Sequence, residues 1–251
     1  MSRADDASAA IGEALRSLVA WEERTDPTGR DEDTHYRHGD FELRTFEDLH
    51  IYLDRPADAF STTPDLLVFV SRHSGETGPL LTAHFTGNVG PAEFGGRAGE
   101  FAESAPNAGK AVVDALGTYA PDGYEVGIEC THHGPSDVGA PSLFVELGSS
   151  EAEWDDPEGA AAVARAVLAL SGTAPDATPT VDAASAGGAD SGHEPRQIVG
   201  FGGGHYAPQF ERILRETDWA IGHIGSDWVL QSMGAPEVNA AVVDQAFEQS
   251  A

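Results

Sequence analysis

Lysine is almost absent from this chain of 251 residues: Lys110 is the only one, and 14 Lys and Arg together face 42 Asp and Glu. The formal net charge is −28 at pH 7. A broad basic surface, such as most nucleic-acid-binding proteins carry, is therefore missing. A carboxylate-rich surface in which arginine replaces lysine fits a cell interior near molar salt, where the Debye length of about 3 Å screens self-repulsion. We interpret the composition as salt adaptation.

Concentrated salt also weakens the argument against RNA. The release of counterions contributes little to binding there, so an RNA ligand would be held by shape, stacking and hydrogen bonds. The alternative of an acidic disordered chain fails because clear strand and helix patterns persist between the charges.

Several other classes of protein are excluded by what is missing. The single cysteine, Cys130, allows no internal disulfide. No apolar run approaches the roughly 20 residues of a membrane helix, and no signal peptide is evident, so we expect a cytoplasmic protein with no membrane contact. The sequence holds no Walker lysine loop, no GxGxxG and no GxSxG elbow, so we expect neither a nucleotide cofactor nor a serine triad.

Periodic apolar residues predict alternating strands and helices. The predicted strands are residues 41–46, 50–53, 66–70, 80–85, 124–131, 143–147, 197–201 and 219–224. The predicted helices are residues 9–21, 107–119, a helix that begins at Pro157, 208–216 and 237–249. Ser150 and Glu153 have the spacing of a capping box. This order predicts an α/β fold: a three-layer α/β/α single domain over residues 1–251, with a mostly parallel central sheet.

Two segments are expected to be irregular. Residues 22–39 are charged and loop-like, and residues 171–195 form a flexible acidic surface insertion rich in Ala, Gly and Pro. The first helix follows the start almost at once, whereas parallel α/β domains often open with a strand. We therefore expect that a strand upstream of Met1 is missing, for example through a misassigned start.

Polar, glycine-dense clusters follow several predicted strands, where open α/β sheets place their ligands. They cover residues 71–74, 84–88 with 95–96, 129–135, 144–150 and 202–208. Glycines after a strand form turns, or let backbone N–H groups approach an anion. Residue type alone does not separate these two interpretations.

Half of the ten histidines lie in these clusters: His73, His84, His132, His133 and His205. We expect a catalytic or metal-binding role for at least two of them. His132 and His133 point to opposite faces in a regular strand, so both serve one site only if the Gly134–Pro135 turn re-aims them.

The acidic residues and the cysteine of these clusters are less informative. Glu129 shares the parity of His133 only while the strand stays regular. Glu146 lies inside an apolar strand and needs a buried partner or a ligand. The spacing matches no compact metal motif, so it indicates zinc only weakly. Cys130 is interpreted as a small buried hydrophobe.

Taken together, the clusters resemble the archaeal-type D-aminoacyl-tRNA deacylase family, which also occurs in plants. The matching segments, in the order of the family, are SRHS (71–74), LTAHFTGN (81–88), ECTHHGP (129–135), FVELGSSEAEW (144–154) and GFGGGHYAP (200–208). The resemblance implies hydrolysis of the ester at the tRNA 3′ end, a fold similar to peptidyl-tRNA hydrolase and nucleoside phosphorylases, and Zn²⁺.

We expect the site residues to fall into three groups. Catalytic roles are expected for His133, His205 and His84, with His133 or His205, or a metal, activating the attacking water. Substrate-binding roles are expected for Arg72, His73, Gly87, Asn88, Gly95, Gly96, Ser149, Gly203, Gly204 and Tyr206. Metal ligands are expected to be His132, His133 and Glu146.

Within the substrate-binding group, Arg72 is expected to hold a terminal phosphate. Backbone N–H groups at Gly87–Asn88 or Gly203–Gly204 are expected to stabilise the oxyanion. The partner is the 3′ acceptor end of D-aminoacyl-tRNA, and the protein is expected to be a monomer or homodimer. Two alternatives stay open: another hydrolase of tRNA esters or of peptidyl-tRNA, and a non-catalytic module that binds the tRNA 3′ end.

Overall fold

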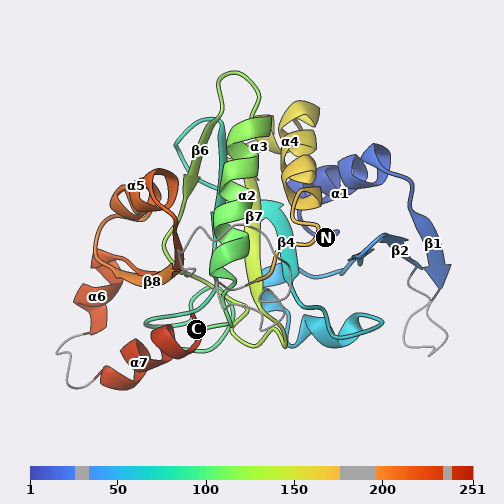
Figure 1. Cartoon of the computed structure of the whole chain (residues 1–251). Helices are drawn as coiled ribbons and strands as arrows, with labels where there is room; N and C mark the ends of the chain where they lie inside the picture. Colours follow the sequence, from blue (N-terminus) through green and yellow to red (C-terminus); the bar gives the residue numbers. More distant parts are fainter. Residues whose placement is uncertain (26–33, 176–195, 234–238, 251) are drawn as a thin grey trace, which may run out of the picture.

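A four-stranded sheet runs through the middle of the molecule (Figure 1). The computed structural model describes residues 1–25, 34–175, 196–233 and 239–250. In sheet order the strands are β4 (Leu67–Arg72), β7 (Ser142–Gly148), β5 (Leu80–His84) and β6 (Glu125–Ile128). The α/β class predicted from the sequence is confirmed.

The direction of one central strand differs from the prediction of a mostly parallel sheet. β4 and β7 are parallel, and so are β5 and β6, but β5 runs antiparallel to β7. The sheet is therefore mixed. The antiparallel register places Thr82 directly opposite Glu146, and the parallel register places Ser71 opposite the same glutamate from the other side. Both neighbours of Glu146 are thus polar.

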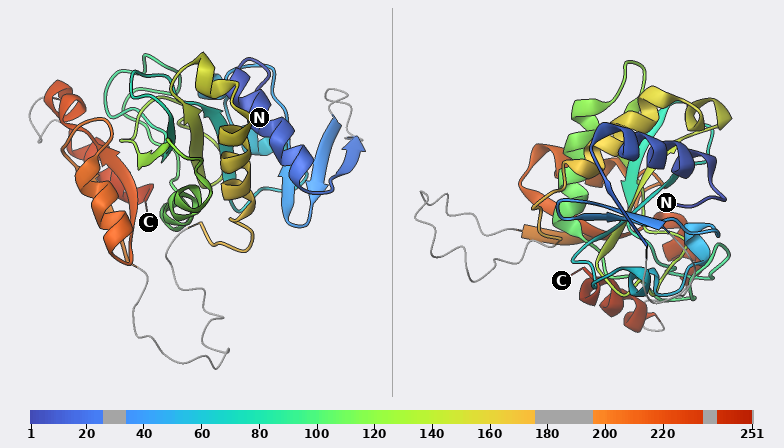
Figure 2. Two further views of the ribbon diagram at one scale, coloured as in Figure 1. Left: turned by 90° about the horizontal axis from the view of Figure 1, so that it is seen from above. Right: turned by 90° about the vertical axis from the view of Figure 1, so that its right-hand side faces the viewer.

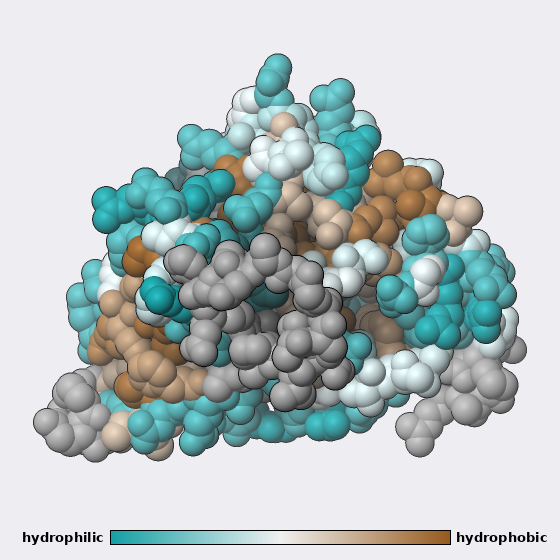
Figure 3. Space-filling model, viewed as in Figure 1, coloured by the Kyte–Doolittle hydropathy of each residue, from teal (hydrophilic) through white to brown (hydrophobic). Residues whose placement is uncertain are grey.

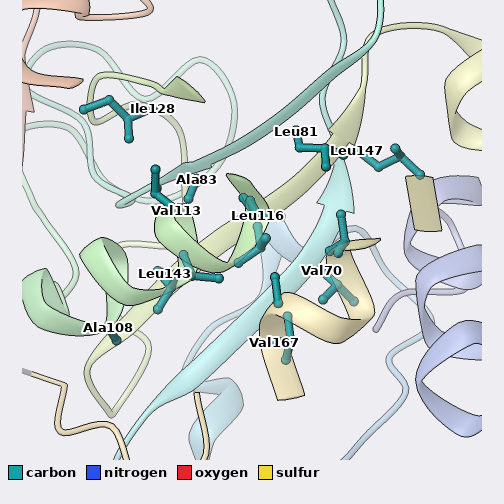
Figure 4. Packing of buried hydrophobic residues seen from close by; sticks show 14 of the residues in the cluster. Val70, Leu81, Ala83, Ala108, Val113, Leu116, Ile128, Leu143, Leu147 and Val167 are labelled. Carbon is teal, nitrogen blue, oxygen red and sulfur yellow. The ribbon is translucent and has the colours of Figure 1, made fainter. Parts of the chain in front are cut away.

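Three helices cover one face of this sheet: α1 (Asp6–Leu18), α4 (Pro157–Leu168) and α2 (Pro106–Tyr119). Their apolar side chains meet those of β4, β5 and β7 in the main core (Figure 4). Leu116 of α2 and Leu147 of β7 are completely buried there. Truncation of such a leucine to alanine costs about 2–5 kcal/mol, so this face supplies much of the stability.

Loops and two short 3₁₀ helices cover the opposite face of β4 and β7. These helices are η1 (His50–Tyr52) and η2 (Pro56–Ala59). Ala57 of η2 packs with Phe69 and Phe144 in a second small core. In the described residues, therefore, no second helical layer covers these strands as the three-layer prediction required. The strand predicted over residues 50–53 is also wrong, because Leu53 N–H donates to His50 O in a 3₁₀ turn.

A second, two-stranded sheet lies beyond β6. It consists of β8 (Arg196–Phe201) and β9 (Trp219–Gly225), which are parallel and joined by α5 (Pro208–Glu216). Thr131, just past β6, donates its N–H to Ile224 O and so ties the two sheets together. The chain ends with α6 (Asp227–Met233), which was not predicted, and α7 (Ala240–Glu248).

The segment predicted as a loop before residue 40 contains two strands. β1 (Glu22–Thr25) and β2 (Thr34–His38) pair antiparallel, and β3 (Phe41–Leu43) pairs with β2. All four residues of β1 are exposed. A strand with both faces in water has no apolar alternation, so the pattern that reveals strands was absent. This meander and the C-terminal elements lie at opposite ends of the molecule (Figure 2).

The capping box of Ser150 and Glu153 is confirmed, and it starts α3 (Glu151–Trp154). Of the predicted insertion over residues 171–195, the part from 176 onward lies outside the described residues. None of the described helices combines the length and apolar character that crossing a membrane requires. On the face seen in Figure 3, hydrophilic residues line much of the edge of the molecule, and hydrophobic residues lie between them.

Candidate active site

The candidate site lies on the face of the sheet that the long helices leave uncovered. Because strand side chains alternate, Val70 and Val145 point into the helix-covered core, whereas Ser71 and Glu146 point to the other face. Glu146 is 4% exposed, and its Oε1 accepts a hydrogen bond of 2.7 Å from Ser71 Oγ. The buried glutamate predicted to need a partner has one.

Two histidines lie on either side of Glu146. His73 Nδ1 is 3.6 Å from its Oε2, and His84 Nε2 is 3.4 Å from its Oε1. Burial alone would raise the pKa of Glu146, but His73 and His84 lower it to about 2. Glu146 is therefore ionised at neutral pH although water is excluded.

A second buried carboxylate, Glu129, lies just after β6. His205 Nε2 is 2.6 Å from its Oε2, His73 Nδ1 is 3.2 Å from its Oε1, and His132 Nε2 is 3.7 Å from its Oε2. Burial would raise the pKa of Glu129, but these rings hold it well below the usual range. His73 therefore lies between two carboxylates.

The two carboxylates keep the neighbouring rings protonated. Burial lowers the pKa of His73, but Glu129 and Glu146 outweigh it and raise this pKa to about 9. Burial likewise opposes charge on His205, yet its contacts with Cys130 and Glu129 raise its pKa to about 10. Both imidazolium charges are balanced locally by the two glutamates.

The turn after Glu129 brings His132 and His133 to the same side. His133 has a φ of 46°, in the left-handed region, so the regular alternation of the strand ends there. The rings of His132 and His133 lie 4.3 and 4.8 Å from that of His84, and 4.4 Å from each other. The turn therefore directs both His132 and His133 into one site, as the sequence analysis required.

These three rings share one hydrogen-bonding pattern. His84, His132 and His133 each use Nδ1 on a backbone carbonyl, at 3.1, 2.8 and 2.7 Å. A carbonyl only accepts, so each Nδ1 carries the proton. In a neutral ring the lone pair is then on Nε2. Burial and nearby His84 lower the pKa of His133 to about 4, so this ring is neutral at pH 7.

Ligand atoms of these residues converge in three overlapping groups, in each of which they lie within 4.8 Å of one another. The groups are His84 with His132 and His133, Glu129 with His132 and His205, and His73 with Glu129 and Glu146. The predicted trio of His132, His133 and Glu146 is not one of them. Glu146 instead lies beside His84, which joins the two neighbouring histidines.

Tyr206 closes one end of the cluster. Its hydroxyl is 3.2 Å from His73 Nε2, and its ring is 5.1 Å from that of His205. The backbone of His73 is held in place by a hydrogen bond, because Trp154 Nε1 donates to His73 O at 2.9 Å. Tyr206 is 36% exposed and therefore faces both the cluster and solvent.

The N–H groups of the two predicted oxyanion sites differ in whether they already donate a backbone hydrogen bond. Gly87 N–H donates to His133 O at 2.8 Å, and Asn88 N–H donates to Glu100 O at 2.9 Å. Neither is free for an oxyanion. Within the described residues, the N–H groups of Gly203 and Gly204 donate to no backbone carbonyl. Of the two predicted oxyanion sites, only the one beside His205 keeps its donors.

Gly95 and Gly96 pack closely against the backbone of the turn that follows His133. A Cβ on Gly96 would approach Gly134 Cα to 3.1 Å, and Asn88 Nδ2 donates to Gly95 O at 2.9 Å. These glycines therefore allow two chain segments to pack closely. Whether they also touch substrate stays a prediction.

Two predicted substrate-binding residues lie elsewhere. Arg72 follows Ser71 on β4 and so points to the helix-covered side, where its guanidinium lies 5.2 Å from the ring of Trp154. Ser149 Oγ donates to Gly78 O at 2.9 Å and Ser149 N–H donates to Glu153, so this residue braces a turn. Neither is brought against the histidines.

Sequence reasoning missed two members of the site. Glu129 was noted only for its strand parity, although it contacts three histidines. Ser71 was not selected, although its hydroxyl bonds Glu146. Ser71 lies two residues before His73, so the two share one face of the strand, and this spacing was the available signal. Which face of the strand is directed toward the site depends on the pairing of β4 with β7, which the sequence does not show.

Comparisons with known proteins agree on one family. A family profile described as D-aminoacyl-tRNA deacylase matches residues 60–251. Curated proteins of that name from Halorubrum lacusprofundi and Natronomonas pharaonis are 56% and 55% identical over 100% of this chain, and the match covers 54% and 53% of their own length. The chain therefore spans about half the length of these relatives.

A solved structure is similar over nearly the whole chain. It is a crystal structure of a conserved protein of unknown function, with a TM-score of 0.79 and 30% identity. The match covers 99% of this chain and 81% of that one. The fold described above is thus shared with an experimentally determined structure.

Proposed function

The chain belongs to the D-aminoacyl-tRNA deacylase family. We propose that its histidine–glutamate cluster hydrolyses the ester between a D-amino acid and the 3′ end of tRNA. The observation that carries the proposal is the convergence of five histidines and two buried carboxylates on one sheet face. Such a density of perturbed groups in one place is typical of catalytic sites. The reaction belongs in the cytoplasm, where aminoacyl-tRNA is used.

His133 is the best placed general base. Its Nδ1–H donates to Gly134 O, so the lone pair on Nε2 is available. Its pKa of about 4 keeps it neutral at working pH. In the protein without bound metal, a water attacks the ester carbonyl while its proton passes to Nε2 of His133. The acyl–oxygen bond then breaks, and the ribose oxygen leaves with a proton.

His205 has a different task. Its Nε2 is bonded to Glu129 and its Nδ1 lies 3.6 Å from Cys130 Sγ, so neither nitrogen is free to accept a proton. The protonated ring instead places a positive charge next to Gly203 and Gly204. The N–H groups of these glycines, together with that charge, would stabilise the oxyanion.

Three of these histidines, His133 included, also fit a zinc site. Nε2 of His84 is buried and has no aligned hydrogen-bond partner, and the Nδ1–H bonds of His84, His132 and His133 leave three Nε2 atoms as ligands. Backbone acceptors behind metal-binding histidines are the usual arrangement. We propose that these three residues hold Zn²⁺ when the metal is bound. Nε2 of His133 would then be a ligand, and the ion would supply the activation of the water in place of this ring. When bound, Zn²⁺ lowers the pKa of a coordinated water and polarises a carbonyl.

We propose that chiral selection comes from the shape of the site. A pocket discriminates against a substrate when a misplaced group leaves its polar atoms unpaired or clashes with the wall. Here the wall is rigid, because both carboxylates and Ser71 are fixed by hydrogen bonds. We propose that an L side chain is directed into this wall, whereas a D side chain is directed toward solvent.

Release of free tyrosine from D-Tyr-tRNA and L-Tyr-tRNA, measured in molar KCl, tests the proposal. We expect hydrolysis of the D form only. Equal hydrolysis of both forms would refute chiral selection. Hydrolysis of N-blocked aminoacyl-tRNA with none of the D form would favour a peptidyl-tRNA hydrolase, and binding without turnover would favour a non-catalytic module. Activity that rises with KCl concentration would support salt adaptation.

A further inference from the structure

The two most exposed large apolar side chains of the described residues belong to adjoining segments beside the His133 turn. Phe94 is 62% exposed and Tyr52 is 59% exposed. We call this pair the aromatic ledge. Single exposed apolar residues are normal on protein surfaces. Here two exposed aromatic side chains lie on adjoining segments next to a candidate active site, and an aromatic ring offers a stacking surface to a flat ligand.

Glycine contacts bring the ledge together. Gly95 follows Phe94, and a Cβ on Gly95 would meet the carbonyl of Ile51 and lie 3.2 Å from Tyr52 Cδ1. The φ of Gly95 is +77°, a conformation that side-chain-bearing residues rarely adopt. The loop of Phe94 and the helix of Tyr52 are therefore in backbone contact.

The ledge is joined directly to the site. Gly134 N–H donates to Phe94 O at 2.9 Å, and a Cβ on Gly134 would meet the backbone of Gly95 and Ile51 at 2.5 Å. Gly134 follows His133, whose ring lies in the cluster. A molecule that reaches His133 from this side passes the ledge.

The charges around the ledge argue against recognition by phosphate contacts alone. Two arginines lie near it, but Arg97 is paired with Asp54 and Glu100, and Arg55 is paired with Asp58 and Asp137. Positive charge next to the ledge is thus neutralised, on a protein with a net charge of −28. Stacking on an aromatic ring needs no net charge and survives high salt.

We propose that Tyr52 and Phe94 are the surface on which the unpaired bases at the 3′ end of tRNA stack while the ester lies at His133. The inference rests on the proposed function, because it takes the acceptor end of tRNA as the substrate. It adds to that function a binding site for the nucleotides before the terminal adenosine, formed by two residues that lie outside the histidine–glutamate cluster.

A hairpin RNA that ends in unpaired ACCA, and the same hairpin with a blunt end, provide the probes. Their binding to the full chain is measured by fluorescence anisotropy in molar KCl. We expect Phe94→Ala and Tyr52→Ala each to weaken binding of the tailed hairpin about 5- to 100-fold, the effect of removing one stacking ring. Phe94→Trp should restore it, and the blunt hairpin should bind weakly to all variants.

Tyr119→Ala is the matched control. Tyr119 is an exposed aromatic at the end of α2, on the helix-covered side of the sheet, and its removal should change nothing. The inference is overturned if wild type does not prefer the tailed hairpin, or if both ledge variants bind it as wild type does. Equal weakening in Tyr119→Ala would also overturn it.

Kinetics separate this inference from the proposed function. With D-Tyr-tRNA, Phe94→Ala should raise KM and leave kcat unchanged, whereas D-tyrosyl-adenosine, which lacks the stacked bases, should be hydrolysed as by wild type. If the wild-type chain hydrolyses neither substrate, the proposed function fails, and hairpin binding still decides the role of the ledge.

Discussion

Nε2 of His205 lies 2.6 Å from Oε2 of Glu129, although 76 residues separate the two in the chain. The contact joins the end of β6 to the glycine-rich loop after β8, and so connects the two sheets across the candidate site. Cys130 N–H donates to His205 O at 2.7 Å and adds a backbone bond at the same junction. The position and the charge of His205 both depend on this pair.

Glu129→Gln should therefore change the protonation of His205. With Glu129 ionised, the pKa of His205 is raised to about 10, so the ring stays protonated from pH 6 to 9. Without that charge, burial opposes protonation with only the contact to Cys130 against it, so the pKa of His205 should fall. NMR titration of ¹⁵N-histidine in chelator-treated protein measures this. A wild-type His205 that titrates near 6.5 would contradict the pairing.

Gly134→Ala should disturb the His133 turn. The new Cβ would overlap the backbone of Gly95 and Ile51, which cannot move as a side chain can. We expect a loss of about 1–3 kcal/mol in stability, the usual cost of overpacking, and a lower deacylation rate. Gly204→Ala is the control, because nothing lies within 4 Å of its Cβ and its N–H is kept. Chemical denaturation measures the free energy of unfolding of both variants. Equal stability of the two would show that the turn tolerates the overlap.

His223 should make the protein sensitive to acid. It is fully buried between Thr131 and Ala102 O, and burial lowers its pKa to about 4. Above pH 6.5 the ring is neutral in both folded and unfolded chains. Between pH 6.5 and 4 only the unfolded chain takes up the proton, so stability falls as pH falls, by about 3 kcal/mol in total.

The contribution of His223 is separated from that of other histidines by difference. Unfolding free energies of wild type and His223→Gln are compared at pH 7.5 and pH 4.5. Wild type should lose more stability than the variant over this interval. Equal losses would show that His223 does not titrate differently in the folded protein.

Metal content tests the assignment of His84, His132 and His133. Protein purified in molar KCl should hold about one Zn²⁺ per chain in this three-histidine site, and His84→Ala should lose it. His38→Ala is the control, because His38 lies on β2, far from the cluster in the chain, and is bonded to Ala20 O. Zinc retained in full by His84→Ala would refute the assignment.

Much of the fold could be predicted from the sequence, because most strands and helices are buried on one side at least. The apolar run of β4 and the capping box before α3 are examples, and both elements lie where the pattern placed them. The direction of β5 could not be predicted, since a buried strand has the same pattern whichever way it runs. β1 was missed because it has no buried side.

The site was partly predictable for the same reason. Histidines at predicted strand ends were recognisable, and the structure brings His73, His84, His132, His133 and His205 together. Their arrangement around Glu129 and Glu146 depends on the antiparallel pairing of β5 with β7, which no local pattern reveals. Arg72 was assigned to the site because it lies next to His73 in the sequence. Side chains alternate along a strand, so Arg72 points to the other face of the sheet.

The general-base role of His133 is tested by the single-turnover rate of D-Tyr-tRNA hydrolysis in molar KCl, with chelator-treated His133→Asn compared with chelator-treated wild type. If His133 takes the proton of the attacking water, the rate should fall about 10²- to 10⁴-fold, while tRNA binding and the thermal unfolding midpoint stay close to wild type. A variant that folds, binds tRNA and hydrolyses the D-ester at the wild-type rate would contradict the account.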